Sequence, residues 1–188
     1  METHVRLEPW SAGDFWLLER KNEPAMTRFL GGPEPAAKLV DRQRRYEALS
    51  AREPAAGRMF RVVWTPDGEG PAAGGRTESV GSVGFWEREW QGEPVYESGW
   101  GILPEFQGHG LAAAALTELL AYVRAHGSRG SVHAFPGTDH PASNAVCRRA
   151  GFEYLGDVDF EYPPGVPHPS CDWRYRVGRP QGGLTPSG

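Results

Sequence analysis

The chain has 188 residues and a formal net charge of −4 at pH 7, a length that fits one domain with a substantial core. Its 39% hydrophobic and 23% charged residues are close to globular averages and argue against a disordered chain. The acidic balance argues against general nucleic-acid binding, which needs a basic surface. With neither a signal-like N-terminus nor an apolar stretch of roughly 18 residues, a soluble cytoplasmic protein without a membrane span is expected.

Strands and helices are predicted to follow one another along the whole chain. Residues 4–10 form a first strand, and Ser11 then caps a helix over residues 14–21 that Pro24 is expected to close. The later elements, in chain order, are a helix over 36–49, strands over 58–64, 80–86 and 95–103, a helix over 108–126, a strand over 131–135, a helix over 143–150, and strands over 152–162 and 171–177.

Glycine and proline mark the breaks between these elements. Residues 65–78 are dominated by Gly, Pro and Ala and favour a loop, and residues 91–94 favour a turn. Gly99 and Gly101 suit a bulged or splayed strand. Residues 1–178 are predicted to form a single domain, followed by a disordered tail over residues 179–188.

The stretch WGILPEFQGHGLAAAALTELL carries the strongest functional signal, because an apolar strand runs through a short turn into a helix that opens with Gly108 and Gly110. The first N–H groups of a helix have no partner within it and lie at the positive end of its dipole, so such a turn can bind phosphate oxygens. The alternative is that the two glycines only permit a tight turn. A P-loop is excluded, because no Gly-Lys-Ser/Thr follows.

In this turn Gln107, Gly108, Gly110 and Ala112 match the Gln/Arg-x-x-Gly-x-Gly/Ala signature, and the chain here resembles the GNAT superfamily of N-acetyltransferases, which bind acyl-coenzyme A. About thirty residues later, SNAVCRRAGF resembles the last helix and following strand of that superfamily. The strand before the signature is similar to the branch that contains ribosomal-protein N-terminal acetyltransferases, through Glu97, Gly99, Trp100 and Pro104.

The resemblance implies a fold, a cofactor and a reaction. The expected fold is a mixed, mostly antiparallel α/β sheet of six or seven strands with splayed central strands and about four flanking helices. The cofactor would be acetyl-coenzyme A, and the acceptor an amine that attacks the thioester directly. That acceptor is either a protein N-terminus or a small molecule, and family habit favours a homodimer.

The resemblance also assigns cofactor-binding residues, mainly through their backbone. Ile102 and Leu103 would pair with the pantetheine arm, and amides of the turn would hold the pyrophosphate. The turn residues in this set are Gln107, Gly108, His109, Gly110, Leu111 and Ala112. The His109 side chain either meets a phosphate or is solvated on the first helical turn.

The second motif departs from the family pattern at two positions. His140 stands three residues before Ser143, where many relatives have an asparagine that contacts the cofactor arm, and Asn144 is near but out of phase. Asn144 is therefore either a cofactor contact or a helix-surface residue. Cys147 stands where the family often has a tyrosine as general acid; it either protonates the departing thiolate or packs in the core.

Glu97 is the candidate general base, because it lies on the strand beside the cofactor site and partial burial would raise its pKa. The alternative is structural, with Glu97 paired to an arginine or a backbone amide. A non-catalytic acyl-coenzyme A sensing module is the rival function, favoured if Glu97 points away from the thioester. His126, His133 and His140 recur every seven residues but share no face, so no metal site is expected.

Overall fold

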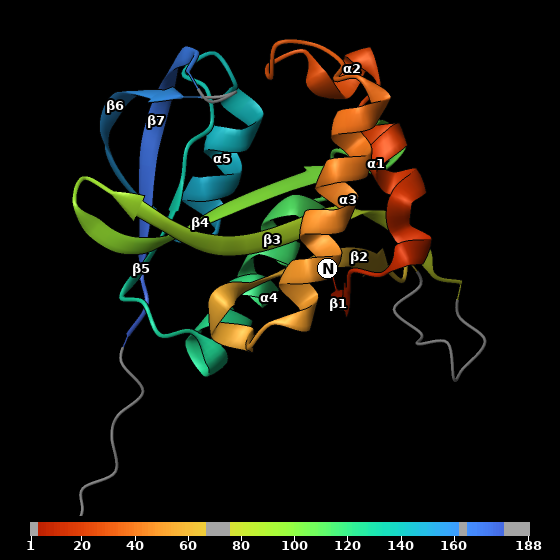
Figure 1. Ribbon diagram of the computed structural model, residues 1–188, viewed down its shortest axis with the longest axis horizontal. Helices are drawn as coiled ribbons and strands as arrows, with labels where there is room; N and C mark the ends of the chain where they lie inside the picture. Colours follow the sequence, from red (N-terminus) through yellow and green to blue (C-terminus); the bar gives the residue numbers. More distant parts are fainter. Residues whose placement is uncertain (1–3, 67–75, 162–164, 179–188) are drawn as a thin grey trace, which may run out of the picture.

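The computed structural model of the protein describes residues 4–66, 76–161 and 165–178 (Figure 1). One seven-stranded sheet runs in the order β1-β2-β3-β4-β5-β7-β6. Its strands are β1 (Val5–Pro9), β2 (Gly57–Trp64), β3 (Glu78–Trp90), β4 (Glu93–Ile102), β5 (Ser131–Ala134), β6 (Glu153–Glu161) and β7 (Pro167–Arg176). The neighbouring strands are antiparallel except β4 and β5, which are parallel. The expected mixed, mostly antiparallel sheet is confirmed.

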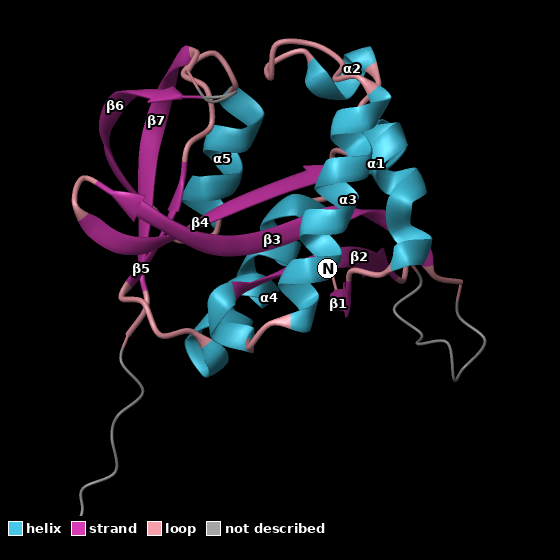
Figure 2. Cartoon of the chain, viewed as in Figure 1, coloured by secondary structure: helices cyan, strands magenta, loops and turns pink. Residues whose placement is uncertain are grey.

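Five α-helices cover the described sheet, and Figure 2 shows the first three of them together on one side. They are α1 (Phe15–Lys21), α2 (Pro24–Thr27), α3 (Ala36–Ala51), α4 (Leu111–His126) and α5 (Pro141–Arg149). Among the described helices, none is long and apolar enough to cross a membrane.

The two faces of the sheet have separate cores. The larger core joins strand residues such as Phe85, Tyr96 and Val132 to the buried side of α4, whose apolar residues recur at three- and four-residue spacing. A smaller core packs Leu17 and Leu18 of α1 against the sheet on the other side. Helices α4 and α5 therefore close one face, and α1 and α3 close the other.

The central hairpin is longer than the sequence indicated. Strands β3 and β4 pair without a register shift from Gly81 opposite Ile102 to Trp90 opposite Glu93. Only Gln91 and Gly92 form the turn, both with positive φ, 53° and 81°. The expected turn over 91–94 was too long, because a two-residue turn with this twist lets β3 and β4 stay paired up to Trp90 and Glu93.

The parallel pair β4 and β5 is short, and this opens the sheet. Their register contains only Tyr96 opposite Val132 and Glu97 opposite His133. Beyond Glu97, β4 continues to Ile102 along β3 without a described partner on its other side. Residues 98–102 form what is called here the free edge of β4. The expectation of splayed central strands is confirmed.

Gly99 and Gly101 do not form the expected bulge, since the register with β3 runs straight through them. A Cβ on Gly99 would lie 3.0 Å from the Trp86 ring, and a Cβ on Gly101 would lie 2.7 Å from Cε of Lys21. The two glycines therefore make room for neighbouring side chains.

Other sequence expectations need correction or fall outside the described residues. Pro24 starts α2 rather than closing α1, because its missing N–H costs nothing at the first helical position. Strand β7 begins at Pro167, inside the expected loop, as an extended segment beside β6. The tail over 179–188 and most of the loop over 65–78 lie outside the described residues.

Candidate active site

The free edge of β4 exposes backbone groups that the sheet leaves unused. The amide of Leu103 donates to the carbonyl of Val80 at 2.8 Å, which makes this a hydrogen-bonded pair. Because such pairs alternate along an antiparallel ladder, the backbone groups of Ser98, Trp100 and Ile102 face away from β3. They point to where β5 would lie if the parallel pairing continued. An extended, amide-bearing ligand can satisfy them.

The end of β4 corrects one sequence expectation. Leu103 uses its amide on Val80, and its carbonyl accepts from the Phe106 amide at 2.9 Å, so its backbone is engaged within the protein. Ile102 does lie on the free edge, although its carbonyl already accepts from Nε2 of Gln107 at 2.8 Å. Trp100, which the sequence analysis did not assign to the cofactor, has the outward-facing backbone that was expected of Leu103.

After a 3-10 turn (Pro104–Phe106), the chain enters α4 through two left-handed glycines. Gly108 has φ 83° and Gly110 has φ 75°, values that favour glycine. The amide of Ala114 donates to the Gly110 carbonyl at 3.1 Å. The amides of Leu111 and Ala112 precede this bond and have no partner inside the helix, so they are placed to meet an anion.

Two residues of the expected phosphate-binding set have other contacts. The Gln107 amide donates to the Pro104 carbonyl at 3.2 Å, so it closes the 3-10 turn. The ring of His109 lies 5.2 Å from that of Trp64, and its Nδ1 is 3.2 Å from the Phe106 carbonyl oxygen. The His109 side chain is exposed and leans on the protein through these contacts, and its neighbouring glycines form the open part of the turn.

The second motif begins α5 at the other side of the opening. His140 caps this helix, with its Nε2 3.1 Å from Oγ of Ser143, and its ring stacks on Phe29 with centroids 4.1 Å apart. Burial lowers the pKa of His140 below its ordinary value. Phe29 follows α2 in the chain, so this stack joins the N-terminal helices to α5.

Asn144 has partners for both ends of its amide. Its Nδ2 donates to the carbonyls of Gly137 and His140, each at 2.9 Å, and its Oδ1 accepts from Nε1 of Trp173 at 2.7 Å. These bonds tie α5 to β7. They support a structural role that differs from both readings of the sequence, because the half-buried side chain already has partners within the protein.

Cys147 lies in the larger core with 0% of its surface exposed. Burial raises the pKa of its thiol far above the ordinary value. Such a thiol is a poor proton donor to a thiolate whose own pKa is ordinary. The location supports the packing alternative for Cys147.

Glu97 lies where β4 and β5 separate. Its side chain is 14% exposed, and its Oε2 accepts from Nη1 of Arg88 at 2.8 Å. Burial raises the pKa of Glu97, while the charge of Arg88 and hydrogen bonds from Trp86 and Arg88 act in the opposite direction. The arginine pair foreseen as the structural alternative is therefore present together with the raised pKa expected of a base.

Sequence reasoning missed a buried polar chain beside Glu97. His133 lies opposite Glu97 in the strand register, and its Nδ1 is 2.7 Å from Oδ1 of Asp172. The other carboxylate oxygen of Asp172 accepts from Nε1 of Trp90 at 2.9 Å. His133 and Asp172 are 39 residues apart, so only the pairing of β5 with β7 brings them together.

Lys21 is a second residue that the sequence did not indicate. It is the last residue of α1, where basic residues are common because of the helix dipole, so nothing in the pattern predicts its burial. Its Nζ donates to Oγ of Ser82 at 2.6 Å. Burial, with a smaller effect of the Arg42 charge, lowers the pKa of Lys21 to about 8.

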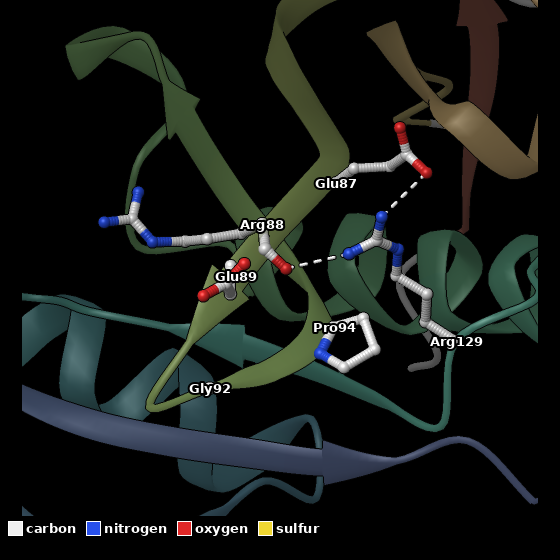
Figure 3. A pocket seen from close by; sticks show the side chains of 6 residues that line it. All are labelled: Glu87, Arg88, Glu89, Gly92, Pro94 and Arg129. Atoms are coloured by element: carbon white, nitrogen blue, oxygen red, sulfur yellow. Dashed lines mark hydrogen bonds and ion pairs between the residues drawn. The ribbon is translucent and has the colours of Figure 1, made fainter.

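A separate hollow of about 440 Å³ opens at the turn between β3 and β4 (Figure 3). There Arg129 donates to Glu87 and to the Arg88 carbonyl, both at 2.8 Å. The side chain of Arg88 points away from these two residues, as Figure 3 shows. Because Glu87, Arg88 and Arg129 already have partners, we place the candidate active site at the free edge of β4 rather than in this hollow.

Three similar structures illustrate the likeness of fold. Spermidine N-acetyltransferase from Vibrio cholerae, solved with CoA and spermine, has a TM-score of 0.67 and 15% identity over 92% of this chain and 95% of that one. A Salmonella typhimurium acetyltransferase that modifies the N-terminal serine of ribosomal protein L7/L12 has a TM-score of 0.71 and 18% identity over 94% and 97% of the two chains. An aminoglycoside acetyltransferase with coenzyme A and kanamycin has a TM-score of 0.67 and 17% identity over 92% and 95%.

A search of curated protein sequences gives no match. The family model described as an acetyltransferase (GNAT) domain matches residues 4–153, from β1 to the start of β6. This region contains the free edge of β4, the glycine turn and α5. Since the match spans well over half of the chain, the protein belongs to the GNAT acetyltransferase family.

Proposed function

We propose that the protein transfers an acetyl group from acetyl-coenzyme A to a primary amine, by direct attack within a ternary complex. One observation carries this proposal: the unpaired edge of β4 leads, within a few residues, into the glycine-opened start of α4. An extended chain of amides that ends in a pyrophosphate fits this combination. Its amides can pair with the free edge of β4, and its pyrophosphate can bind at the start of α4. That is the chemistry of coenzyme A.

The cofactor contacts follow from the geometry of the chain. Backbone groups of Trp100 and Ile102 would pair with the pantetheine arm, and the amides of Gly108, Leu111 and Ala112 would hold the pyrophosphate. When bound, acetyl-coenzyme A supplies an activated acyl group. His140 and Ser143, at the start of α5, would border the arm on the side opposite β4.

Glu97 would accept the proton that the acceptor must lose. An alkyl amine with a pKa near 10.4 is neutral only about once in 2,500 molecules at pH 7, whereas an α-amine near 7.8 is neutral far more often. A base therefore helps alkyl amines most. The raised pKa of Glu97 and its place where β4 and β5 part support this role.

The leaving group would depart without a dedicated acid. Cys147 is fully buried with a raised pKa, so we assign it to packing. A thiolate with an ordinary pKa is stable enough to leave near neutral pH. A Cys147→Ala variant would then lose stability through its cavity but keep turnover per folded molecule.

The test is an acceptor screen that follows the appearance of free thiol from acetyl-coenzyme A. Peptide N-termini, polyamines, aminoglycosides and amino acids cover the acceptors named for similar structures and the small amines suggested by the sequence. Amine-dependent thiol release together with an acetylated product of matching mass is the expected result. Binding of acetyl-coenzyme A without transfer to any amine would favour the sensing module instead.

A further inference from the structure

Lys21 extends from α1 over the free edge of β4. A Cβ on Gly101 would lie 2.7 Å from Lys21 Cε and 3.2 Å from its Nζ, so the lysine occupies the space that this glycine leaves. The hydrogen bond to Ser82 on β3 fixes the ammonium there, half-buried. The amino group thus lies against the strand segment that is proposed to hold the cofactor arm.

Within the described residues, Lys21 has no carboxylate within ion-pair distance. Three carboxylates of the surrounding segments are bound by arginines, in the pairs Glu34 with Arg42 at 2.5 Å, Glu105 with Arg20 at 2.9 Å, and Glu97 with Arg88 at 2.8 Å. The charge that acts on Lys21 is the like charge of Arg42. A half-buried ammonium without a counter-ion is costly, and an anion brought to it would remove much of that cost.

The α1 side of the sheet, where Lys21 lies, is the side from which an acceptor would reach the free edge of β4. Helices α4 and α5 cover the other face of the sheet, and the start of α4 is proposed to hold the pyrophosphate. The space that a side chain at Gly99 or Gly101 would occupy is on the α1 side of the sheet, next to Trp86 and Lys21. A free amine that reaches the thioester from this side passes the ammonium of Lys21.

We propose that Lys21 is a specificity-determining residue whose ammonium binds an anionic group, a carboxylate or a phosphate, on the amine that is acetylated. This inference rests on the proposed acetyltransferase function and adds the chemical class of the acceptor. Polycations such as polyamines would meet the like charges of Lys21 and Arg42 at this point. An amine that carries an acidic group gains an ion pair in a partly desolvated site instead.

The test compares wild type with Lys21→Met, Lys21→Arg and Lys38→Met. Lys38 is the other lysine of the chain and is exposed on α3, so its variant is the matched control. Each protein is assayed with glycine, β-alanine and phosphoethanolamine, with the neutral counterparts glycinamide and ethanolamine, and with spermidine. Acetyl-coenzyme A affinity is measured separately by calorimetry.

We expect Lys21→Met to lower kcat/KM at least tenfold for the acidic amines, mainly through KM, and less than threefold for their neutral counterparts. Lys21→Arg should retain most of the preference, and Lys38→Met all of it. Equal losses on acidic and neutral amines, a wild-type preference for spermidine, or no turnover of any acidic amine would overturn the inference. If wild type fails to bind acetyl-coenzyme A, the proposed function itself is wrong.

A second measurement does not depend on turnover. Reductive methylation with ¹³C-formaldehyde labels only Lys21, Lys38 and the N-terminal amine, and it keeps the lysine charge. Addition of N-acetylglycine, as a product analogue, to the complex with coenzyme A should shift the Lys21 signal and raise the pKa at which it titrates. An unchanged Lys21 signal at saturating N-acetylglycine would contradict an anion site.

Discussion

Glu97 combines two roles that the sequence presented as alternatives. Its carboxylate is held by Arg88, which favours the ionised form, and it is buried, which favours the protonated form. Burial outweighs the arginine, so the pKa of Glu97 lies above its ordinary value, and its carboxylate is a better proton acceptor than a solvated one. An arginine partner therefore does not remove Glu97 from the chemistry.

The Glu97→Gln variant tests this role, because it keeps the shape and removes the basicity. Turnover on the best alkyl-amine acceptor should fall by about 10²-fold or more, with acetyl-coenzyme A affinity almost unchanged and the rate partly recovered at high pH. Glu87→Gln is the control, since Glu87 pairs with Arg129 in the hollow at the hairpin (Figure 3). A loss smaller than about threefold for Glu97→Gln would mean that water or another residue carries the proton.

Lys21 should have a measurable cost to stability. Its pKa is lowered from 10.5 to about 8, so the folded protein holds the charged form less well than the unfolded chain does. That cost is present in full below about pH 8 and disappears as the pH rises towards 10.5. Lys21→Met should therefore stabilise the protein by about 1 to 3 kcal/mol at pH 7, and by less at pH 9.5.

Thermal melts of wild type and Lys21→Met at the two pH values measure this difference. A variant that is more stable and at the same time less active on acidic acceptors would identify Lys21 as a residue kept for function. Destabilisation at pH 7 would show instead that the lysine holds α1 against the sheet.

At the scale of elements, the start of α4 was the part of the site most readable in the sequence. The glycines predicted a special turn because φ values of 83° and 75° are costly for other residues, and the helix after them shows apolar residues at three- and four-residue spacing. Both signals are local. The sequence therefore placed this element without knowledge of the rest of the fold.

Contacts between distant elements could not be predicted in the same way. Lys21 meets Ser82 and Gly101 only because α1 packs on β3 and β4, and His133 meets Asp172 only because β5 pairs with β7. The hydrogen bonds of the Leu103 backbone could not be foreseen either, because the register of β4 with β3 decides which residues of β4 bond to β3. Strand register is a property of pairs of segments and leaves little trace in either one.

A pair of glycine variants separates backbone strain from cofactor binding. Gly108 in the turn and Gly92 in the β3–β4 hairpin have φ values of 83° and 81°, and a Cβ would meet no atom within 4 Å at either position. Gly108→Ala and Gly92→Ala should each lose about 1 to 2 kcal/mol of stability from the left-handed conformation.

Only Gly108→Ala should weaken acetyl-coenzyme A binding, by tenfold or more, because its methyl group would stand among the amides proposed to hold the pyrophosphate. Calorimetric titration of both variants, with melts as the measure of strain, decides between the two effects. If both variants bind the cofactor as wild type does, the anion site lies elsewhere in the chain.

At the scale of the molecule, one continuous sheet carries the candidate site, which lies at a gap in its strand pairing. Seven strands hold two helical layers apart, and the early separation of β4 from β5 leaves the free edge between them. The proposed cofactor site lies at this break in pairing, and Lys21 lies beside it on the α1 side. The elements were predictable because each has a local pattern, and the family resemblance implied the sheet that they form. The acceptor was not predictable, because the residues around its path come from separate elements.

The most direct test is the melting temperature of the protein with and without acetyl-coenzyme A. Ligand at a hundred times its dissociation constant contributes about 2.7 kcal/mol, which for a domain of this size raises the melting temperature by roughly 5 to 11 °C. Acetyl-pantetheine, which lacks the pyrophosphate, should give a much smaller shift at the same concentration. A cooperative melt that does not move at millimolar acetyl-coenzyme A would contradict the proposed site.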